Sequence, residues 1–374
     1  MRKTILAVTT LIGTIIGAGV FGIPYVIMQS GLLVGLIHII IIAALTMIIT
    51  LYLGEIALRT KENYQLTGYA QKYLGTKGKL LMMASLAFGI YAAALAYLIG
   101  TSESLSFLFF ETTKYSLYMG ILFWAFMTVI TLFGIKALQE GEFFGVIIIL
   151  VLIIALSVFF ANKIDVSNLT YQPILDIKDY FVPFGVILFA FLGYTTIPEV
   201  ERILGKDKRG MKSAIIIATL ISTIVYILFP IIVIGLKGQA TPALATIALG
   251  KPFILLGIIT MLTSYLALSI ALIDMFQFDY NQSKIKSWLY TSLIPLILFI
   301  IMQLTNTANF TKVLGIGGVI SGGLTSILII FMANKAKYLG DRKPEYSIPT
   351  HKLIIWIMII LFALGTIGEI VNTI

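Results

Sequence analysis

Glycine and proline interrupt two apolar stretches of this chain in the same order. The first stretch is GTIIGAGVFGIP, from Gly13 to Pro24, and the second is FAFLGYTTIPE, from Phe189 to Glu199. Glycine and proline destabilise a helix by about 1 and 3 kcal/mol relative to alanine, so both stretches are predicted to be interrupted helices. Unwound backbone exposes amide and carbonyl groups, and these groups can bind a charged small molecule or an ion.

The two interruptions expose complementary groups. Amides at Gly17, Ala18 and Gly19 would begin the second half of the first helix, where the positive end of the helix dipole suits a carboxylate. Carbonyl groups between Phe189 and Gly193 would suit an ammonium group. Together they predict a binding site for a zwitterion such as an amino acid.

The side chains expected around this zwitterion are uncharged. They are Val20, Phe191, Tyr194 and one tyrosine of the third apolar run, either Tyr91 or Tyr97. A charged substrate side chain would meet no counter-ion there, so we expect a neutral, apolar or aromatic amino acid. Ordinary packing is the alternative interpretation for each aromatic residue.

A second kind of chemistry is indicated by three hydroxyls in the eighth apolar run, at Thr260, Thr263 and Ser264. Thr263 and Ser264 follow Thr260 by three and four residues, which places all three near one face of a helix. Hydroxyl and carbonyl oxygens are hard ligands that small cations prefer, so the cluster predicts a sodium site. The alternative is that these hydroxyls bond to their own helix backbone. If protons are used instead, the candidate proton or gate residue is Glu199, beside Pro198.

The composition places these stretches in a membrane. The chain has 374 residues, of which 59% are hydrophobic and only 11% charged. A soluble domain carries about 25% charged residues, and several runs here exceed the roughly 18–20 apolar residues that span a bilayer. The absence of cysteine excludes disulfides and thiol chemistry, and the two histidines, His38 and His351, lie far apart. An enzyme is therefore not expected, and neither is a cofactor other than a coupling ion, Na⁺ or H⁺.

We predict an all-α polytopic membrane protein with eleven transmembrane helices in a single transporter domain. The predicted helices are 4–29, 32–57, 80–100, 116–134, 142–161, 181–204, 211–235, 252–274, 288–303, 313–332 and 353–371. The first long loop, 58–79, is predicted to contain a short interfacial helix. Glu55 and Arg59, four residues apart, are expected to form a surface ion pair.

Orientation follows from the loop charges. With the N-terminus inside, 20 lysine and arginine residues fall on the inner side and 6 on the outer side. Cytoplasmic loops carry the excess of positive charge, so we expect a multi-pass cell-membrane protein with the N-terminus in the cytoplasm and the C-terminus outside. The charge faces anionic lipid, and no nucleic-acid partner or obligate protein partner is inferred.

The interruptions lie at the midpoints of spans 1 and 6, beside Gly17 and Gly193. Unpaired backbone at this depth is costly unless it lines a cavity or binds something. Interrupted helices in corresponding positions point to inverted repeats, here about 4–161 and 181–332, with 353–371 as an extra helix. For span 1 alone, Gly13 and Gly17 could instead form a helix-packing motif.

At these residues the chain resembles the amino acid/auxin permease and aromatic amino acid permease families. Both belong to the amino acid–polyamine–organocation superfamily and have the LeuT-type fold. The similar segments are GTIIGAGVFGIP, YAAALAYLIGTSESL (91–105), GIKALQEGEFF (134–144), LFAFLGYTTIPEVE and LTSYLALSIALIDMF (262–276). They occur in the expected order over nearly the whole chain. Many family members carry a histidine where this chain has Tyr194, so a titrating imidazole is lost here.

The resemblance implies a secondary active transporter that works by alternating access. Spans 1, 2, 6 and 7 would move against spans 3, 4, 8 and 9, and the carbonyls of Gly13 and Ile16 would complete the sodium site. Proton-driven relatives can place a lysine from span 5 there, and 142–161 contains none, so we favour sodium. A membrane receptor or sensor that keeps the fold is one alternative, and a channel is another. A soluble sensor domain would favour the receptor, and rings of charged residues would favour the channel, but the sequence shows neither feature.

Overall fold

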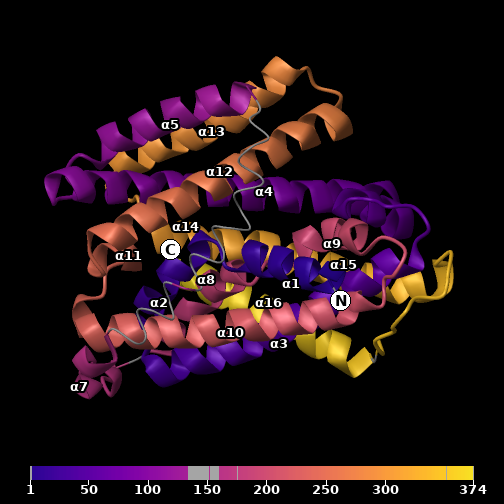
Figure 1. The fold of residues 1–374 in the computed structure, drawn as a ribbon, viewed down its shortest axis with the longest axis horizontal. Helices are drawn as coiled ribbons and strands as arrows, with labels where there is room; N and C mark the ends of the chain where they lie inside the picture. Colours follow the sequence, from indigo (N-terminus) through magenta and orange to yellow (C-terminus); the bar gives the residue numbers. More distant parts are fainter. Residues whose placement is uncertain (1, 134–150, 152–159, 175, 351, 374) are drawn as a thin grey trace.

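The structure is a computed structural model that describes residues 2–133, 151, 160–174, 176–350 and 352–373 (Figure 1). Every regular element in these described ranges is a helix. The first part of the chain forms α1 (Arg2–Ile15), the 3₁₀ turn η1 (Ala18–Gly22), α2 (Ile23–Ser30), α3 (Leu32–Arg59), α4 (Leu66–Phe110) and α5 (Ser116–Phe133). Predicted span 142–161 lies almost wholly outside the described residues.

The rest of the chain continues as helices joined by short turns. The elements are η3 (Ala161–Lys163), α7 (Val166–Leu169), η4 (Ile177–Phe181), α8 (Val182–Ala190), η5 (Tyr194–Thr196), α9 (Ile197–Leu204), α10 (Gly210–Lys237), η6 (Gly238–Ala240), α11 (Ala245–Ala248), α12 (Lys251–Tyr280), α13 (Lys284–Leu304), α14 (Phe310–Gly317), the π-helical η7 (Gly318–Gly322), α15 (Gly323–Leu339) and α16 (Lys352–Thr373).

Many of these helices are long and apolar enough to cross a membrane. Among the described residues there are seven such helices, and the bent pair formed by α1 and by Ala18–Ser30 makes eight. The helices α5 and α16 are apolar but have shorter apolar segments, Ser116–Leu132 and Ile355–Glu369. The protein is therefore a multi-pass, all-helical membrane protein.

The helices run side by side in two groups (Figure 1). In one group α4 packs against α5, α12 and α13, and in the other α1 packs against α10, and α8 against α2. The α14–η7–α15 segment contacts both groups, through α4 and through α8. We call the end with residues 161–174 and 238–250 the α7 end, and the end with residues 60–65, 205–209 and 340–349 the Lys337 end.

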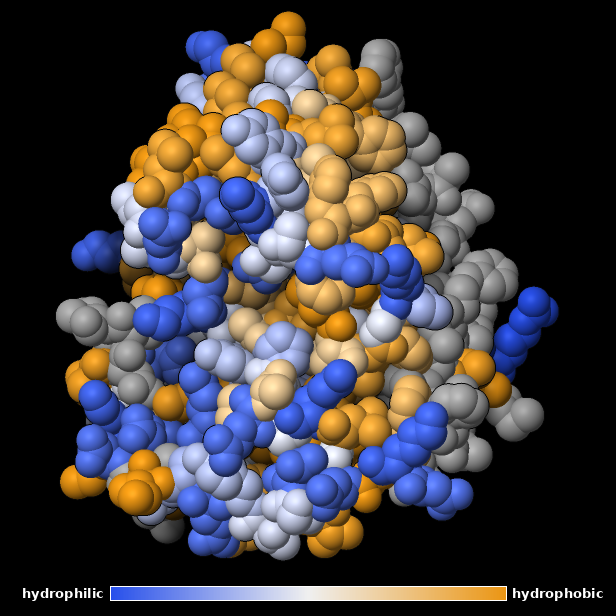
Figure 2. Space-filling view, turned by 90° about the vertical axis from the view of Figure 1, so that its left-hand side faces the viewer, coloured by the Kyte–Doolittle hydropathy of each residue, from blue (hydrophilic) through white to orange (hydrophobic). Residues whose placement is uncertain are grey.

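The surface agrees with a lipid environment. Figure 2 looks onto the α7 end, where apolar residues gather towards the top and hydrophilic residues spread over the lower part. The top of this view corresponds to the side of α5 and α13 in Figure 1. Large exposed apolar side chains follow both helices, among them Leu122, Phe126, Ile297 and Ile301.

The third span is longer than the predicted range 80–100. α4 runs from Leu66 to Phe110 and bends at Gly75, whose φ of 77° lies in the left-handed region that glycine adopts readily. The segment before this bend is the helix expected within loop 58–79. The predicted end at Gly100 was wrong because that glycine is a packing position. A Cβ there would lie 2.7 Å from Met261 Sδ.

The Lys337 end also corrects one prediction. Glu55 is only 2% exposed, so its bond to Arg59 is not a surface ion pair. The carboxylate also accepts bonds from the Lys337 ammonium, the Ser347 hydroxyl and the backbone amide of Ile348, at 2.7–3.2 Å. The pairing was predictable from helical spacing, but the burial was not, because the covering loop is distant in sequence.

Candidate functional site

The first interruption separates α1 from η1. The amide of Ile16 still bonds to the carbonyl of Ile12, at 2.7 Å, but Gly17 is extended, with φ −95° and ψ −161°. The amide of Gly17 turns back to the carbonyl of Ile15, at 3.0 Å. Ala18 and Gly19 begin a new helical turn, so their amides have no carbonyl one turn earlier to bond. They are two of the three donors expected from the sequence, and the third, the amide of Gly17, is occupied by the carbonyl of Ile15.

The second interruption separates α8 from η5 and α9. Helix α8 ends at Ala190, and residues 191–193 are not α-helical. The carbonyl of Phe189 accepts the amide of Leu192 at 3.2 Å, and that of Phe191 accepts the amide of Gly193 at 2.7 Å. The carbonyl groups between Phe189 and Gly193 are therefore partly occupied by local turns, which the sequence argument did not anticipate.

The two interruptions lie against each other. A Cβ added at Gly19 would lie 3.2 Å from the Cα of Ala190, and a Cβ at Gly193 would lie 2.4 Å from Cγ1 of Ile15. Each glycine thus gives the backbone of one interruption room to approach the other. The hydroxyls of Thr14 and Thr196, 2.6 Å apart, add a polar link between α1 and η5.

Tyr226 of α10 connects both interruptions, and the sequence analysis did not predict it as a site residue. Its buried hydroxyl lies 2.5 Å from the carbonyl oxygen of Ile15 and 2.9 Å from that of Ala190. Its ring packs edge-on against Phe191, with centroids 4.8 Å apart. The available signal was a tyrosine inside an apolar run, because a buried phenol needs a hydrogen-bond partner.

The two tyrosines proposed from span 3 have different surroundings. Tyr97 is buried and close enough to Tyr226 to interact with it electrostatically. The hydroxyl of Tyr91 instead donates to the carbonyl of Tyr290 on α13, at 3.2 Å. Tyr97 is thus the one directed towards the interruptions.

The other proposed selectivity residues are packed closely. Val20 and Phe191 are buried, and the ring of Phe189 lies 3.3 Å from the Cβ position of Gly19. Tyr194 is buried too, and its hydroxyl bonds with Thr325 of α15. Thr325 is 2.8 Å from the hydroxyl of Ser85 on α4, so the Tyr194 phenol connects η5 to α15 and α4.

The three candidate cation ligands of α12 also differ. Thr260 donates to the carbonyl of Leu256 at 2.9 Å, and Thr263 donates to that of Thr260 at 3.0 Å. Ser264 faces the first interruption, because a Cβ at Gly17 would lie 4.0 Å from its Oγ and 4.0 Å from the carbonyl oxygen of Thr14.

The carbonyl partners of this cation site lie in the last turn of α1. The amide of Gly17, which would bond to the carbonyl of Gly13 in a continuous helix, bonds to Ile15 instead. Ile16 is buried in the same turn. No group of three His, Cys, Asp or Glu residues that could hold a metal occurs in the described parts of the chain. Any cation here would therefore depend on carbonyl and hydroxyl oxygens.

The acidic residues of α9 lie towards the Lys337 end. Glu199 is exposed. Glu201 is buried, accepts the hydroxyl of Tyr69 at 3.0 Å and forms an ion pair with Lys208. Helix α9 is thus held to α4 through Glu201, while Glu199 lies on the surface of the protein.

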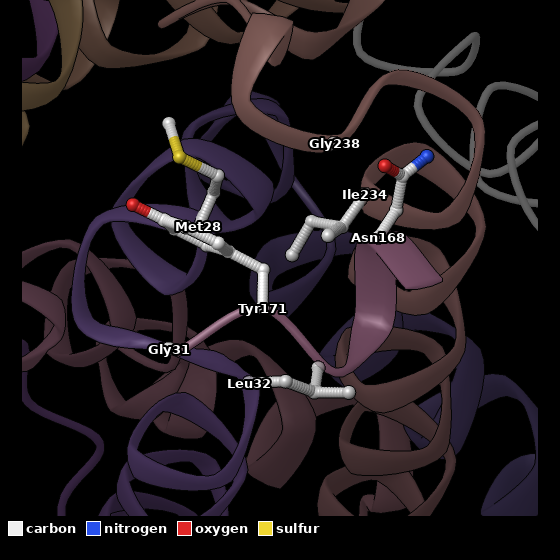
Figure 3. Close-up of a pocket in the computed structure, with 7 residues that line it drawn as sticks. All are labelled: Met28, Gly31, Leu32, Asn168, Tyr171, Ile234 and Gly238. Carbon is white, nitrogen blue, oxygen red and sulfur yellow. The ribbon is translucent and has the colours of Figure 1, made fainter. Parts of the chain in front are cut away.

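A small pocket lies at the other end, away from the interruptions (Figure 3). It is lined by Met28, Gly31, Leu32, Asn168, Tyr171, Ile234 and Gly238. Asn168 holds the α7 segment to α10 by donating to the carbonyl of Gly235, at 3.1 Å. The α7 segment therefore covers the turn between α2 and α3.

Two interrupted helices that face each other inside a multi-pass bundle are the arrangement expected of a membrane transporter with the LeuT-type fold. The profile of the tryptophan/tyrosine permease family matches residues 1–370, and the chain belongs to this family. The predicted resemblance to aromatic amino acid permeases is thereby confirmed.

Individual relatives are distant but nearly full-length. The glutamine transporter 2 of Aliivibrio fischeri is 24% identical over 332 residues, covering 83% of each chain. The tyrosine-specific transport system 1 of Haemophilus influenzae is 23% identical over 394 aligned positions, covering 98% of this chain and 96% of the relative. The structure resembles MhsT, crystallised with L-phenylalanine, with a TM-score of 0.68, 16% identity and 98% of both chains covered.

Proposed function

We propose that this protein is a secondary active transporter that carries a neutral, apolar or aromatic amino acid by alternating access. The observation that carries the proposal is the meeting of the two interruptions, at Gly19 with Ala190 and at Gly193 with Ile15. The amides of Ala18 and Gly19 would receive the substrate carboxylate. The carbonyl ends of α8 would receive its ammonium group.

A neutral substrate is supported by the side chains around the interruptions. Val20, Phe189, Phe191 and Tyr97 are uncharged and buried or partly buried. A charged substrate side chain would lose its hydration there without gaining a counter-ion, which is unfavourable. The relatives are named for tyrosine and glutamine, and MhsT was crystallised with phenylalanine, all of them neutral amino acids.

Uptake into proteoliposomes tests this proposal. Labelled tyrosine, tryptophan, phenylalanine, leucine and glutamine are offered singly, followed by competition with lysine and glutamate. We expect saturable uptake of at least one neutral amino acid and no competition by charged ones. Uptake of none of them, or strong competition by lysine or glutamate, would contradict the substrate assignment.

For the coupling ion we propose sodium, bound between the last turn of α1 and Ser264. The support is the carbonyl of Thr14 and the hydroxyl of Ser264, each 4.0 Å from the Cβ position of Gly17. A methyl group fits there without overlap but would fill the space between these oxygens. The carbonyls of Gly13 and Ile16 remain further proposed ligands, and Glu199 remains the alternative for proton coupling or a gate.

The sodium assignment is tested by substrate affinity in sodium, potassium and choline buffers across pH. Gly17→Ala and Ser264→Ala should each weaken sodium dependence while the protein folds normally. Thr260→Ala is the matched control, because that hydroxyl bonds to its own helix. Affinity that follows pH and ignores sodium in the unmodified protein would refute the assignment and direct attention to Glu199.

We further propose eleven spans, in inverted repeats of about 4–161 and 181–332 plus 353–371, with the Lys337 end in the cytoplasm. The support is the concentration of lysine and arginine in the loops of that end. Reporter fusions after residue 374 and within 340–349 should label opposite sides of the membrane. Labelling on the same side would contradict both the number of spans and the orientation.

A further inference from the structure

Glu369 of α16 is a buried carboxyl group that the proposed transport cycle does not use. Its side chain is 6% exposed. A Cβ added at Gly315 of α14 would lie 2.1 Å from its Oε1, and one added at Gly185 of α8 would lie 2.8 Å from its Cδ. The backbone amide of Gly185 bonds to the carboxyl group. The two glycines therefore form a cradle that the carboxyl group fills.

Helix α16 is held tightly to α8 beside this cradle. A Cβ at Gly365 would lie 2.2 Å from the ring of Phe184, and one at Gly368 would lie 2.4 Å from the ring of Phe181. Two glycines shortly before Glu369 thus let α16 approach η4 and the beginning of α8. The carboxyl group is therefore held where α8, α14 and α16 meet.

The cradle borders a groove of about 350 Å³ at the α7 end, the end seen in Figure 2. The groove is lined by Tyr25, Val26, Gln29, Ile174, Asp179, Val182, Val186, Asn309, Thr311, Lys312 and Glu369. Glu369 is four residues from the end of α16 at Thr373, which is about 6 Å of helix. The opposite end of α16 is about 26 Å away, so exchange with water takes place at the α7 end.

The groups around Glu369 indicate that its carboxyl group binds a proton. Within the groove the titratable groups are Asp179 of η4, Lys312 of α14 and Tyr25 of α2. Helix α8 has no titratable side chain; η4 adds Lys178 and Tyr180, and α15 carries Lys335, Lys337 and Tyr338 near its far end. Glu369 belongs to no metal-holding group of His, Cys, Asp and Glu in the described ranges.

We propose that Glu369 is a proton-binding site that controls the further opening of this groove. Removal from water costs an ionised carboxylate far more than a neutral carboxylic acid. The neutral acid therefore stays in the cradle while the groove keeps the narrow form of this structure. Release of its proton to water at the α7 end favours separation of α8 from α14 and α16. The proton returns from the same end, so it regulates transport and does not drive it.

The experiment measures groove opening directly in the full chain, in lipid nanodiscs with saturating sodium and no substrate. The native chain has no cysteine, so a single Val186→Cys thiol reports on the groove. Val186 is 1% exposed and lines the groove, so it reacts with a membrane-impermeant maleimide only when the groove opens. Thr113→Cys, at an exposed position of the same end, corrects for the pH dependence of the reagent and thiol.

We expect the corrected labelling rate to rise between pH 5 and pH 8.5, by up to about tenfold per pH unit on the steep part, as one proton is released. Glu369→Gln, which keeps the shape but cannot ionise, should label slowly at every pH. Asp179→Asn should keep the pH response. Gly315→Ala, whose methyl group takes the place of Oε1, should label quickly even at pH 5.

A flat profile in the unmodified background, or an unchanged pH response in Glu369→Gln, would overturn the proposal. Loss of the response in Asp179→Asn would overturn it too, by assigning the proton to Asp179. The inference rests on the proposed function only in taking the groove as part of a transport cycle. The labelling assay contains no substrate, so it tests the Glu369 proposal independently of transport. If the groove opened with pH but no amino acid was transported, the proposed function would fail and the Glu369 proposal would stand.

Discussion

Tyr226→Phe is the sharpest test of how the two interruptions are held together. The change removes one hydroxyl and keeps the ring that packs against Phe191. The carbonyl of Ile15 still accepts the amide of Gly17, so the loss falls mainly on the carbonyl of Ala190. Leaving a buried polar group unpaired costs about 1–3 kcal/mol.

This energy should appear in substrate affinity. If the phenol holds both interruptions in the binding geometry, its loss lets other arrangements compete, and the apparent affinity falls with the competent fraction. A cost of about 1–3 kcal/mol corresponds to roughly 5- to 150-fold weaker binding. The midpoint of thermal unfolding should fall as well.

Scintillation proximity or calorimetric binding to purified protein measures the first effect, and a thermal-shift assay measures the second. Tyr265→Phe is the matched control. This tyrosine of α12 is also buried, and its hydroxyl bonds to no other residue in the described parts of the chain. Binding within twofold of the unmodified protein together with unchanged thermal stability in Tyr226→Phe would refute the reasoning.

Two further predictions concern contacts at the site and at the Lys337 end. Gly193→Ala should abolish substrate binding, because its Cβ would lie 2.4 Å from Cγ1 of Ile15. Adding Ile15→Ala to this variant should restore binding. Failure of the double variant to recover binding would count against this contact. Loop 340–349 should loosen only in strong acid. The hydrogen bonds from the Lys72 ammonium and from the amide of Lys61 hold the pKa of Asp341 below its usual range. The ionised pair therefore stabilises the loop at neutral pH, and this stabilisation is lost as pH falls through the lowered pKa. Hydrogen–deuterium exchange, corrected for intrinsic rates, should show more protection of residues 340–343 above about pH 4 than below it. In Asp341→Asn the protection of these residues should be lower and should not change across this pH range. Loosening already at pH 6 in the unmodified protein would contradict the assignment.

The sequence by itself determined the class of protein and the place of the interruptions. An apolar content of 59% with 11% charge requires a lipid environment for a chain of this length. Glycine and proline weaken helices locally, whatever surrounds them, so the changes of helix type near Gly17 and Gly193 could be located from neighbouring residues alone. The family segments then gave the relationship that the comparisons confirmed.

Helix boundaries were less accessible to this reasoning. Gly100 resembles a helix end in sequence, but it is a contact with Met261 inside α4. The π-helical turn at Gly318–Gly322 also arises where α8 packs closely, since a Cβ at Gly318 would lie 2.2 Å from the carbonyl oxygen of Gly185. Both features depend on a partner helix distant in sequence.

Only the tertiary structure decided which polar groups meet. Among the three hydroxyls at 260, 263 and 264, helical spacing could not distinguish the one facing Gly17, because the rotation of α12 is set by packing against α4 and η1. The neighbouring residues of Tyr226 and Glu369 could not identify their partners, which are the carbonyls of Ile15 and Ala190 for Tyr226 and the cradle of Gly185 and Gly315 for Glu369. Hydrogen bonding and burial are properties of residue pairs brought together by the fold, whereas helix propensity and hydropathy belong to the residues themselves.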